Sequence, residues 1–441
     1  MSSQLSSDSP ASHPTQAPLP GAHRALGLLL LINMFNYIDR LVLAAVLVSI
    51  GNELLAGDPL IDTRKGWLTT AFLFSYMIAS PLFGWLADRI SRWILIAFGV
   101  LLWSLASGAS GLAGSYGALL TTRLFVGIGE AAYGPVAPAL ISDLYPLVWR
   151  GRVLSWFYMA IPVGSALGYL LGGLAAAWGH WRWAFLAVVP PGIVLGLLCF
   201  LMPDPKRGQV RCTATPSPRP SLREYLQLLR NRSYVLNCLG MAALTFSIGG
   251  VAQWMPNYVQ AYRHWGDEGS VNIIFGTITA FTGLIGTLLG GITGDHLRNK
   301  LPGAYLFVSA LGLFAAFPFF VLMLFVPFPW AWAFVLLAEF FLFFNTGPSN
   351  TALANVTHPS VRATAFALNI FFIHIVGDAI SPPIIGLLSD LTGGNMNVGF
   401  ASVGMMILAG SVFWFWGARY LDRDTMAVAD PLIDSPPCQP H

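Results

Sequence analysis

The chain has 441 residues, of which 55% are hydrophobic and only 10% are charged. Soluble domains carry about 25% charged residues, so this composition excludes a large soluble enzyme and favours a protein that crosses a membrane many times. The net charge of +3 does not indicate a nucleic-acid partner, the four cysteines lack paired metal-ligand spacing, and no Gly-rich loop ends in Lys-Ser or Lys-Thr, as a site for ATP would.

The two ends of the chain differ from its middle. The segments 1–23 and 421–441 are rich in residues such as Ser and Pro and have too little apolar surface to fold alone, so we predict disordered tails there. Between them, runs of roughly 20 mostly apolar residues predict membrane-spanning helices. Twelve such runs lie at 24–51, 66–87, 93–113, 117–140, 153–177, 181–202, 234–258, 271–294, 301–326, 330–356, 362–389 and 397–420.

The longest connection, 203–233, divides the twelve spans into two sets of six. It begins rich in proline and ends, from Ser221, with leucines at helical spacing and nearby arginines, which predicts a short amphipathic helix on the membrane surface. The predicted fold class is therefore an all-α membrane protein. It has an N-terminal six-helix bundle at 24–202, this cytoplasmic linker, and a C-terminal six-helix bundle at 234–420.

The basic residues predict the orientation of the spans, because cytoplasmic loops carry an excess of Lys and Arg. With the N-terminus placed in the cytoplasm, 17 of the 23 basic residues fall on the cytoplasmic side and four on the other. We expect a multi-pass protein of the cell (inner) membrane, surrounded by membrane lipids, with both termini cytoplasmic. We expect a monomer, although no sequence feature fixes the oligomeric state.

The first span is an apolar run that contains the sequence NYIDR at 36–40, and this sequence ends in a charged pair. An ionised Asp or Arg at the middle of a membrane helix costs roughly 2.5–3.5 kcal/mol, so Asp39 and Arg40 are expected to face a cavity or a partner. Asn36 lies four residues before Arg40 and shares its helix face, and Tyr37 adds to the polar stripe. The stripe indicates a helix that lines a water-filled cavity.

Two cytoplasmic turns resemble each other. GWLADRISR (84–92) lies between the second and third spans, and GITGDHLRN (291–299) lies at the matching place in the second half. The glycine would let a neighbouring helix approach closely, and the aspartate could accept hydrogen bonds from a helix end or pair with an arginine. The candidate gating residues of the two turns are Gly84, Asp88, Arg89, Arg92, Gly291, Asp295 and Arg298.

The two halves also share other short sequence motifs. GPVAPAL (134–140) matches GPSNTAL (347–353) at an offset of 213, and the same offset relates Gly164 to Gly377. Two related six-helix halves predict a pseudo-symmetric bundle with a site between the halves near mid-membrane.

The fourth and fifth spans carry further candidates. Arg123 and Glu130 are seven residues apart and share a face of the fourth span. Gly164, Gly168 and Gly172 recur every four residues in the fifth span, which predicts a face that packs closely against another helix.

Polar residues are sparse in the tenth and eleventh spans. Glu339 has apolar neighbours, and the sequence leaves open whether it is neutral and packed or touches substrate. His374 and Asp378 are four residues apart, as a titrating pair would be. Gly377 and Pro382 predict a broken or kinked helix around them. Substrate contact and structural hydrogen bonding stay equally open as roles for this pair.

The twelve spans, the six-plus-six split and the loop G-x-L-x-D-R-x-x-R resemble the major facilitator superfamily over residues 24–420, with Ser91 where the motif has glycine. The resemblance implies that the loop latches the two halves in the outward-facing state and releases as they rock. It also implies that the first and fourth helices line the cavity, so that Arg40 could reach Glu130.

Finer features resemble the spinster family. They are NYIDR (36–40), the pair Gly129-Glu130, RATAFA (362–367) and HIVGDAISPPIIG (374–386). Members of that family are linked to export of lysophospholipids and sphingosine phosphate. The resemblance supports Asp39, Arg40 and Glu130 as the proton-linked residues.

A coupling mechanism follows from these residues. A carboxylate in a low-dielectric cavity tends to hold its proton, whereas a nearby arginine favours the charged form. Movement of Arg40 relative to Asp39 or Glu130 would therefore change proton affinity between two conformations, as coupling requires. The alternative is a static buried ion network that fixes helix packing.

The predicted function is a proton-coupled secondary active transporter that works by alternating access. Its substrate would be an amphipathic lipid of the lysophospholipid or sphingoid phosphate class, with a proton gradient as energy source and no cofactor, metal or catalytic residue. The candidate substrate-binding residues are Asn36, Tyr37, Arg40, Arg123, Glu130, His374 and Asp378.

Other functions remain in competition. A proton-coupled symporter of small organic anions, such as carboxylates or sugar acids, would need a compact polar cavity, and the C-terminal half has no intramembrane Arg or Lys to clamp an anion. A membrane-embedded enzyme would need a clustered nucleophile or metal site, against which the single intramembrane histidine argues. The paired cytoplasmic loops argue against a non-transporting receptor. Substrate identity, direction, symport versus antiport and stoichiometry stay open.

Overall fold

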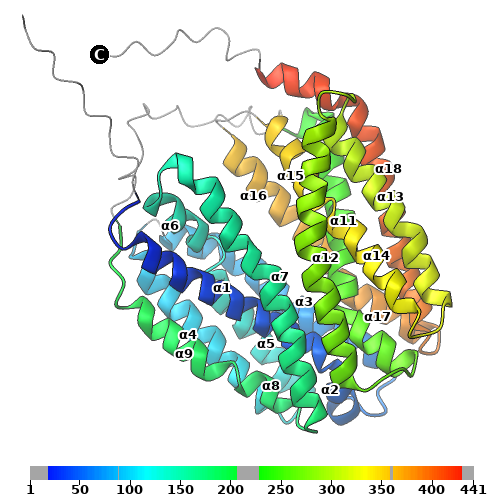
Figure 1. The fold of residues 1–441 in the computed structure, drawn as a ribbon. Helices are drawn as coiled ribbons and strands as arrows, with labels where there is room; N and C mark the ends of the chain where they lie inside the picture. The colour runs from blue at the N-terminus through cyan, green and yellow to red at the C-terminus, as the bar shows by residue number, and fades with distance from the viewer. Residues whose placement is uncertain (1–17, 88, 206–227, 358–360, 430–441) are drawn as a thin grey trace, which may run out of the picture.

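The computed structural model describes residues 18–87, 89–205, 228–357 and 361–429, and every regular element in this part of the chain is a helix. Twelve helical segments are long and apolar enough to cross a membrane, which confirms the predicted all-α, twelve-span fold (Figure 1). The predicted gating residue Asp88, most of the predicted surface helix and most of both predicted tails lie outside the described residues.

The first six spans form the N-terminal half. Its helices are α1 (Ala22–Ala45), α2 (Leu47–Leu54), α3 (Ile61–Ala87), α4 (Arg92–Gly111), α5 (Tyr116–Ala131), α6 (Val136–Leu144), α7 (Leu147–Ala177), α8 (Arg182–Leu186) and α9 (Val189–Cys199).

The last six spans form the C-terminal half. Its helices are α11 (Arg232–Asn257), the π-helix η1 (Tyr258–Tyr262), α12 (Glu268–Leu297), α13 (Ala304–Phe325), α14 (Ala331–Phe343), α15 (Thr346–Asn355), α16 (Arg362–Ile373), the π-helix η2 (His374–Asp378), α17 (Ser381–Leu391) and α18 (Met396–Ala429).

The fourth and tenth spans are both interrupted, and the repeated Gly-Pro words lie at the interruptions. The fourth span breaks between α5 and α6, at Gly134 and Pro135, and the tenth breaks just before α15, which contains Gly347 and Pro348. Proline lacks an N–H donor and disrupts a helix interior, which accounts for a break at the same place in each half.

The structure corrects one predicted boundary. Helix α18 continues to Ala429, although the C-terminal tail was predicted to start at 421. No Gly or Pro follows Gly417 until Pro431, so nothing in the sequence stops the helix. The Asp424 carboxylate also accepts hydrogen bonds from the backbone N–H and the hydroxyl of Ser233, which ties the extension to α11.

We call the end of the bundle where α1 begins and α18 ends the terminal end, and the opposite end the far end. Hydrogen bonds between the halves gather at the far end, where Asn272 donates to the carbonyl of Ala45 and Ser49 donates to Glu268. Helices α7 and α12 stay in contact up to Pro162 and Gly283, near mid-span. Beyond that level the two halves spread apart toward the terminal end (Figure 1).

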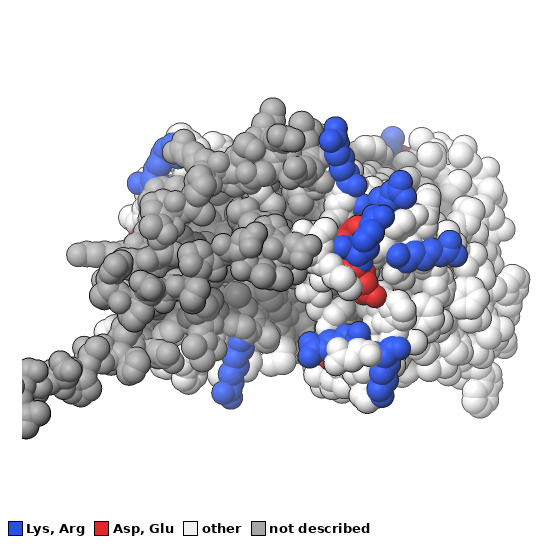
Figure 2. All heavy atoms as spheres, turned by 90° about the horizontal axis from the view of Figure 1, so that it is seen from above, with Lys and Arg blue, Asp and Glu red and all other residues white. Residues whose placement is uncertain are grey.

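The terminal end carries a basic surface on the C-terminal half. Figure 2 shows this face, with Lys and Arg side chains around a few acidic groups. The exposed basic residues near the terminal end of this half are Arg230, Arg232, Arg298, Lys300, Arg419 and Arg423.

Candidate functional site

An ion pair between Arg40 of α1 and Glu130 of α5 lies at the centre of the N-terminal half. Nε of Arg40 donates to Oε2 of Glu130 at 2.7 Å, and its Nη2 lies 2.6 Å from the same oxygen. The Glu130 side chain is fully buried, whereas 19% of the Arg40 side chain is exposed. The Glu130 end of the pair is therefore sealed, whereas the Arg40 end is partly exposed.

Aromatic rings surround the Arg40 guanidinium. Its carbon lies 5.0 Å from the ring centroid of Tyr37, 4.9 Å from that of Phe72 and 5.3 Å from that of Tyr76. A cation within about 6 Å of a ring is attracted by the negative face of the ring. The rings of α1 and α3 thus stabilise a charge that would be costly in the membrane.

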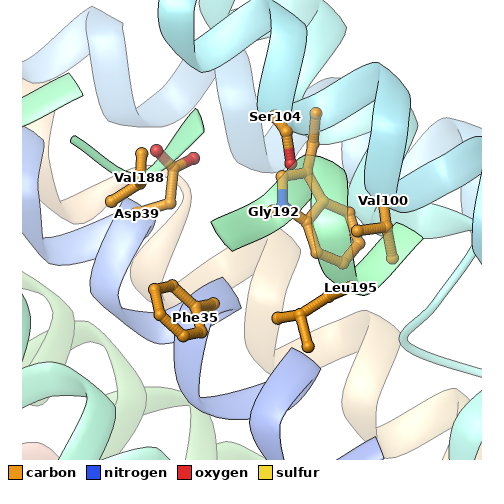
Figure 3. Close-up of a pocket in the computed structure, with 8 residues that line it drawn as sticks. Phe35, Asp39, Val100, Ser104, Val188, Gly192 and Leu195 are labelled. Atoms are coloured by element: carbon orange, nitrogen blue, oxygen red, sulfur yellow. The ribbon is translucent and has the colours of Figure 1, made fainter. Parts of the chain in front are cut away.

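Asp39 points elsewhere, because adjacent residues of a helix are rotated by about 100°. Its Oδ1 accepts a hydrogen bond from the hydroxyl of Ser107 in α4, and its Oδ2 has no partner among the described residues. It lines a cavity of about 10 Å³, room for about one water molecule. Figure 3 shows this cavity with residues of α1 and α4 around it: Phe35 and Asp39 face Val100 and Ser104.

Arg123 lies inside the N-terminal half as well. It is 2% exposed, its Nη2 donates to Ser110 of α4 at 2.7 Å, and its guanidinium lies 5.1 Å from the ring of Phe185 in α8. Asp39 and Arg123 thus each contact a serine of α4, Ser107 and Ser110 respectively. The structure therefore separates the predicted residues: Arg40 and Glu130 pair, whereas Asp39 and Arg123 are buried elsewhere, each against a serine of α4.

His374 and Asp378 of η2 form the predicted pair, with His374 Nδ1 at 2.9 Å and 3.0 Å from the two carboxylate oxygens. The predicted break is present too, because Gly377 has non-helical backbone angles there. About a fifth of each side chain is exposed. The His374 ring meets the edge of Tyr76 with a centroid distance of 6.4 Å, so a line of contacts runs from Glu130 through Arg40 and Tyr76 to the C-terminal half.

Glu339 of α14 is buried against α12, where both carboxylate oxygens accept hydrogen bonds from threonine. The hydroxyl of Thr279 lies 3.2 Å and 3.1 Å from the two oxygens, and that of Thr282 lies 3.3 Å from Oε2. The structure thus places Glu339 in a packed, hydrogen-bonded position in this conformation.

The hydrogen bonds from Thr279 and Thr282 are expected to stabilise the folded protein. Replacing Thr279 and Thr282 together by valine is expected to lower the free energy of unfolding by about 1–3 kcal/mol, because a buried carboxylate would lose its donors. Thermal unfolding in detergent measures the effect, with Thr277→Val as control, since the exposed Thr277 donates only to its own helix at Ile273. Equal midpoints for the double variant and this control would refute the role of the donors.

The candidate gating residues that the structure describes contact side chains of their own halves. Arg92 is buried within its own half, where it binds Asp143 and Asp204, and Arg89 stacks on Trp85. Gly84 has open space around it, which corrects the expectation of a close helix contact at this residue: the halves stand apart at this end.

The matching turn of the C-terminal half also keeps its contacts within that half. Gly291 lies against Gly347, Asp295 accepts a hydrogen bond from Tyr305 at 2.8 Å, and Arg298 lines a pocket at the terminal end.

The glycines of the fifth span pack as predicted. A methyl group on Gly164 would lie 2.5 Å from the carbonyl oxygen of Met34, and one on Gly168 would lie 2.7 Å from that of Ile38. This confirms a close face, and it is α1 that packs on it. The same contact fixes the rotation of α1, and Asn33 adds a hydrogen bond to the carbonyl of Phe157 at 2.8 Å.

Several residues of the site have no clear signal in the sequence. Ser107 and Tyr76 are common residue types in membrane helices, and only their contacts with Asp39 and Arg40 single them out. Thr279 and Thr282 lie three residues apart in an apolar span. That spacing places them on one helix face and could have marked them.

Two six-helix halves that meet at one end, with a buried ion pair close to their interface, define a membrane transporter of the major facilitator type. The sequence profile of the Major Facilitator Superfamily matches residues 29–382. A solved bacterial homologue of the human lysosomal transporter spinster, inward-facing and unoccupied, has a TM-score of 0.76 and 22% identity, covering 96% of this chain and all of that one. A D-xylose–proton symporter reaches a TM-score of 0.72 at 17% identity, covering 88% of this chain and 96% of that one.

Sequence relatives give the family. Protein spinster homolog 3 of Danio rerio is 36% identical, covering 83% of this chain and 76% of the relative. Human protein spinster homolog 1 is 38% identical, with 81% and 71% covered, and the sphingosine-1-phosphate transporter SPNS2 of Danio rerio is 35% identical, with 83% and 76% covered. The chain belongs to the spinster family of the major facilitator superfamily. Its relatives are transporters, which sets the membrane-enzyme alternative aside.

Proposed function

We propose that this transporter carries an amphipathic lipid with an anionic head group, of the lysophospholipid or sphingoid phosphate class, and that a proton gradient drives it. The observation that carries the proposal is the asymmetry of the central ion pair, in which Glu130 is sealed and Arg40 is partly exposed near the interface of the halves. A partly exposed guanidinium beside three aromatic rings suits a phosphate head group with an apolar tail.

The Arg40–Glu130 pair also suits proton coupling. An anionic head group bound to Arg40 competes with Glu130 for the guanidinium. A carboxylate that loses its cation in a buried place becomes easier to protonate. Substrate binding and proton binding would then favour each other. Coupled transport needs such a link, because the substrate must bind the protonated and unprotonated states of the transporter unequally.

Asp39 would take part in proton coupling indirectly. It lies in the sealed cavity beside Ser107, so it meets no head group in this conformation. Helix α1 carries both Asp39 and Arg40. We propose that protonation of Asp39 changes the packing of α1 inside the N-terminal half, and that Arg40 moves with it.

We further propose that the protein works as a monomer in the cell membrane, with both termini in the cytoplasm. The basic residues at the terminal end support this orientation. In that orientation the conformation described here is open toward the cytoplasm and closed toward the outside.

The test is transport into proteoliposomes with an imposed pH gradient. Sphingosine-1-phosphate, a lysophospholipid and a small carboxylate would be compared. We expect the pH gradient to drive movement of one of the two lipids and not of the carboxylate. Asp39→Asn is expected to abolish the dependence on the gradient. Asp58→Asn is the matched control, because Asp58 pairs with Arg64 in a far-end loop of the same half.

Two outcomes would contradict the proposal. Gradient-driven movement of the carboxylate without either lipid would favour the symporter of small organic anions. Unchanged gradient dependence in both Asp39→Asn and Glu130→Gln would favour the static ion network.

A further inference from the structure

Helix α3 of the N-terminal half is capped by the C-terminal half. Its first turn begins at Ile61, and the carboxylate of Asp390 in α17 accepts hydrogen bonds from the backbone N–H groups of Asp62 and Thr63 at 3.2 Å and 2.7 Å. The hydroxyl of Thr63 donates to the same carboxylate at 2.6 Å. A carboxylate at a helix N-terminus satisfies free N–H donors and is favoured by the helix dipole, and here the cap comes from across the interface.

A buried lysine lies beside this cap. Lys65, one of three lysines in the chain, is 5% exposed, and its ammonium lies 3.5 Å from Asp62 and 3.1 Å from the side-chain oxygen of Asn257 in α11. Asn257 belongs to the C-terminal half, so the buried ammonium makes one of its contacts across the interface. One cation thus links a carboxylate of its own half to a side chain of the other half.

The carboxylates are themselves bridged between the halves. Ser389, next to Asp390, donates to Asp62 at 2.9 Å, and Ser49 of α2 donates to Glu268 at 2.6 Å. Close backbone packing brings these groups together, since a methyl group on Gly386 would lie 2.4 Å from the carbonyl oxygen of Asp62. All of these contacts would break if the far end opened.

We propose that Asp390 and Lys65 form the latch that closes the far end of this transporter. Asp390 holds α3 by capping it from the other half, and Lys65 prevents the acidic groups of the two halves from repelling one another. Without Lys65, the buried Asp62 carboxylate would lose its cation next to Asp390 of the other half, which favours separation. The latch rests on the alternation of the proposed transport cycle, but not on its substrate or on protons.

The test measures the distance across the far end directly. Spin labels are placed on cysteines at Leu112 and Trp330, which are exposed in far-end loops of the two halves, in a chain whose native cysteines are serine. Pulsed electron resonance in lipid nanodiscs then gives the distance distribution. We expect Asp390→Ala and Lys65→Met each to raise the long-distance population several-fold over the parent.

Asp58→Ala is the matched control. Asp58 accepts a hydrogen bond from the N–H of Leu60 at 2.9 Å and pairs with Arg64 at 2.9 Å, so it performs the same chemistry one turn earlier without reaching the other half. We expect its distance distribution to match that of the parent. A weaker variant, Thr63→Val, removes only the side-chain donor and should give a smaller shift in the same direction as Asp390→Ala.

Each outcome decides the question. Distributions of Asp390→Ala and Lys65→Met that match that of Asp58→Ala would overturn the latch. If Asp390→Ala does not fold, Thr63→Val and Lys65→Met still test the latch. An unshifted distance distribution in both of these variants would refute it. Failure of lipid or proton-driven transport in proteoliposomes would refute the proposed function and leave these distances as they are.

Discussion

Replacing Arg40 by methionine is expected to abolish transport and to lower the free energy of unfolding by about 3–5 kcal/mol, the usual cost of breaking a buried ion pair. The variant leaves the Glu130 carboxylate fully buried without its cation. The loss of stability should shrink as the pH is lowered, because a protonated Glu130 carries no unpaired charge. Thermal unfolding at several pH values and flux into proteoliposomes measure the two effects.

The double variant Arg40→Met/Glu130→Met separates a structural role from a functional one. Apolar replacement of both partners of a buried pair is often neutral or stabilising, so we expect stability to return while transport stays absent. Recovery of gradient-driven transport along with stability would mean that the pair only holds the helices together.

An exposed pair provides the comparison. Arg182 and Glu53 lie 2.7 Å apart at the far end, with 33% and 47% of their side chains exposed. Exposed ion pairs contribute about 0–1 kcal/mol, so Arg182→Met should change stability far less than Arg40→Met. Transport should continue in this control.

Replacing Gly66 by alanine is expected to wedge the far end open. The added methyl group would lie 2.6 Å from the backbone carbon and oxygen of Pro382 and from the nitrogen of Pro383, in the other half. Overpacking costs about 1–3 kcal/mol, and a bias of that size shifts a two-state equilibrium roughly 5- to 150-fold. The spin-label distance across the far end measures the shift.

This substitution should leave each half folded, because the clash lies between the halves rather than inside one. Transport should fall with the population that can still close at the far end. Gly27→Ala in α1 is the control, since a methyl group there meets open space. A distance distribution and transport rate equal to those of Gly27→Ala would show that α3 and α17 yield without separating the halves.

Features of the molecule that depend on local interactions could be predicted from the sequence. The twelve spans could be predicted because each depends on its own apolar length, and the close face of Gly164 and Gly168 because it depends on helical spacing. The pairing of Arg40 with Glu130 was predicted through the resemblance, and their spans do meet.

The direction of Asp39 could not be predicted in the same way. Both Asp39 and Arg40 were expected to face enclosed water, yet one faces Ser107 in a small cavity and the other faces Glu130. The rotation of α1 decides which of two adjacent residues faces which neighbour, and that rotation depends on its packing against other helices.

The sequence by itself therefore determined the class of the protein, the number of its spans, the two halves and the charged residues that merit study, because apolar length, charge scarcity and repeated words are local properties of the chain. Only the tertiary structure decided that Glu130 is sealed, that Asp39 and Arg123 each contact a serine of α4, and that Asp390 caps a helix of the other half. Those pairings join residues up to 328 positions apart. Such contacts arise only when whole helices have packed, so no short stretch of sequence encodes them.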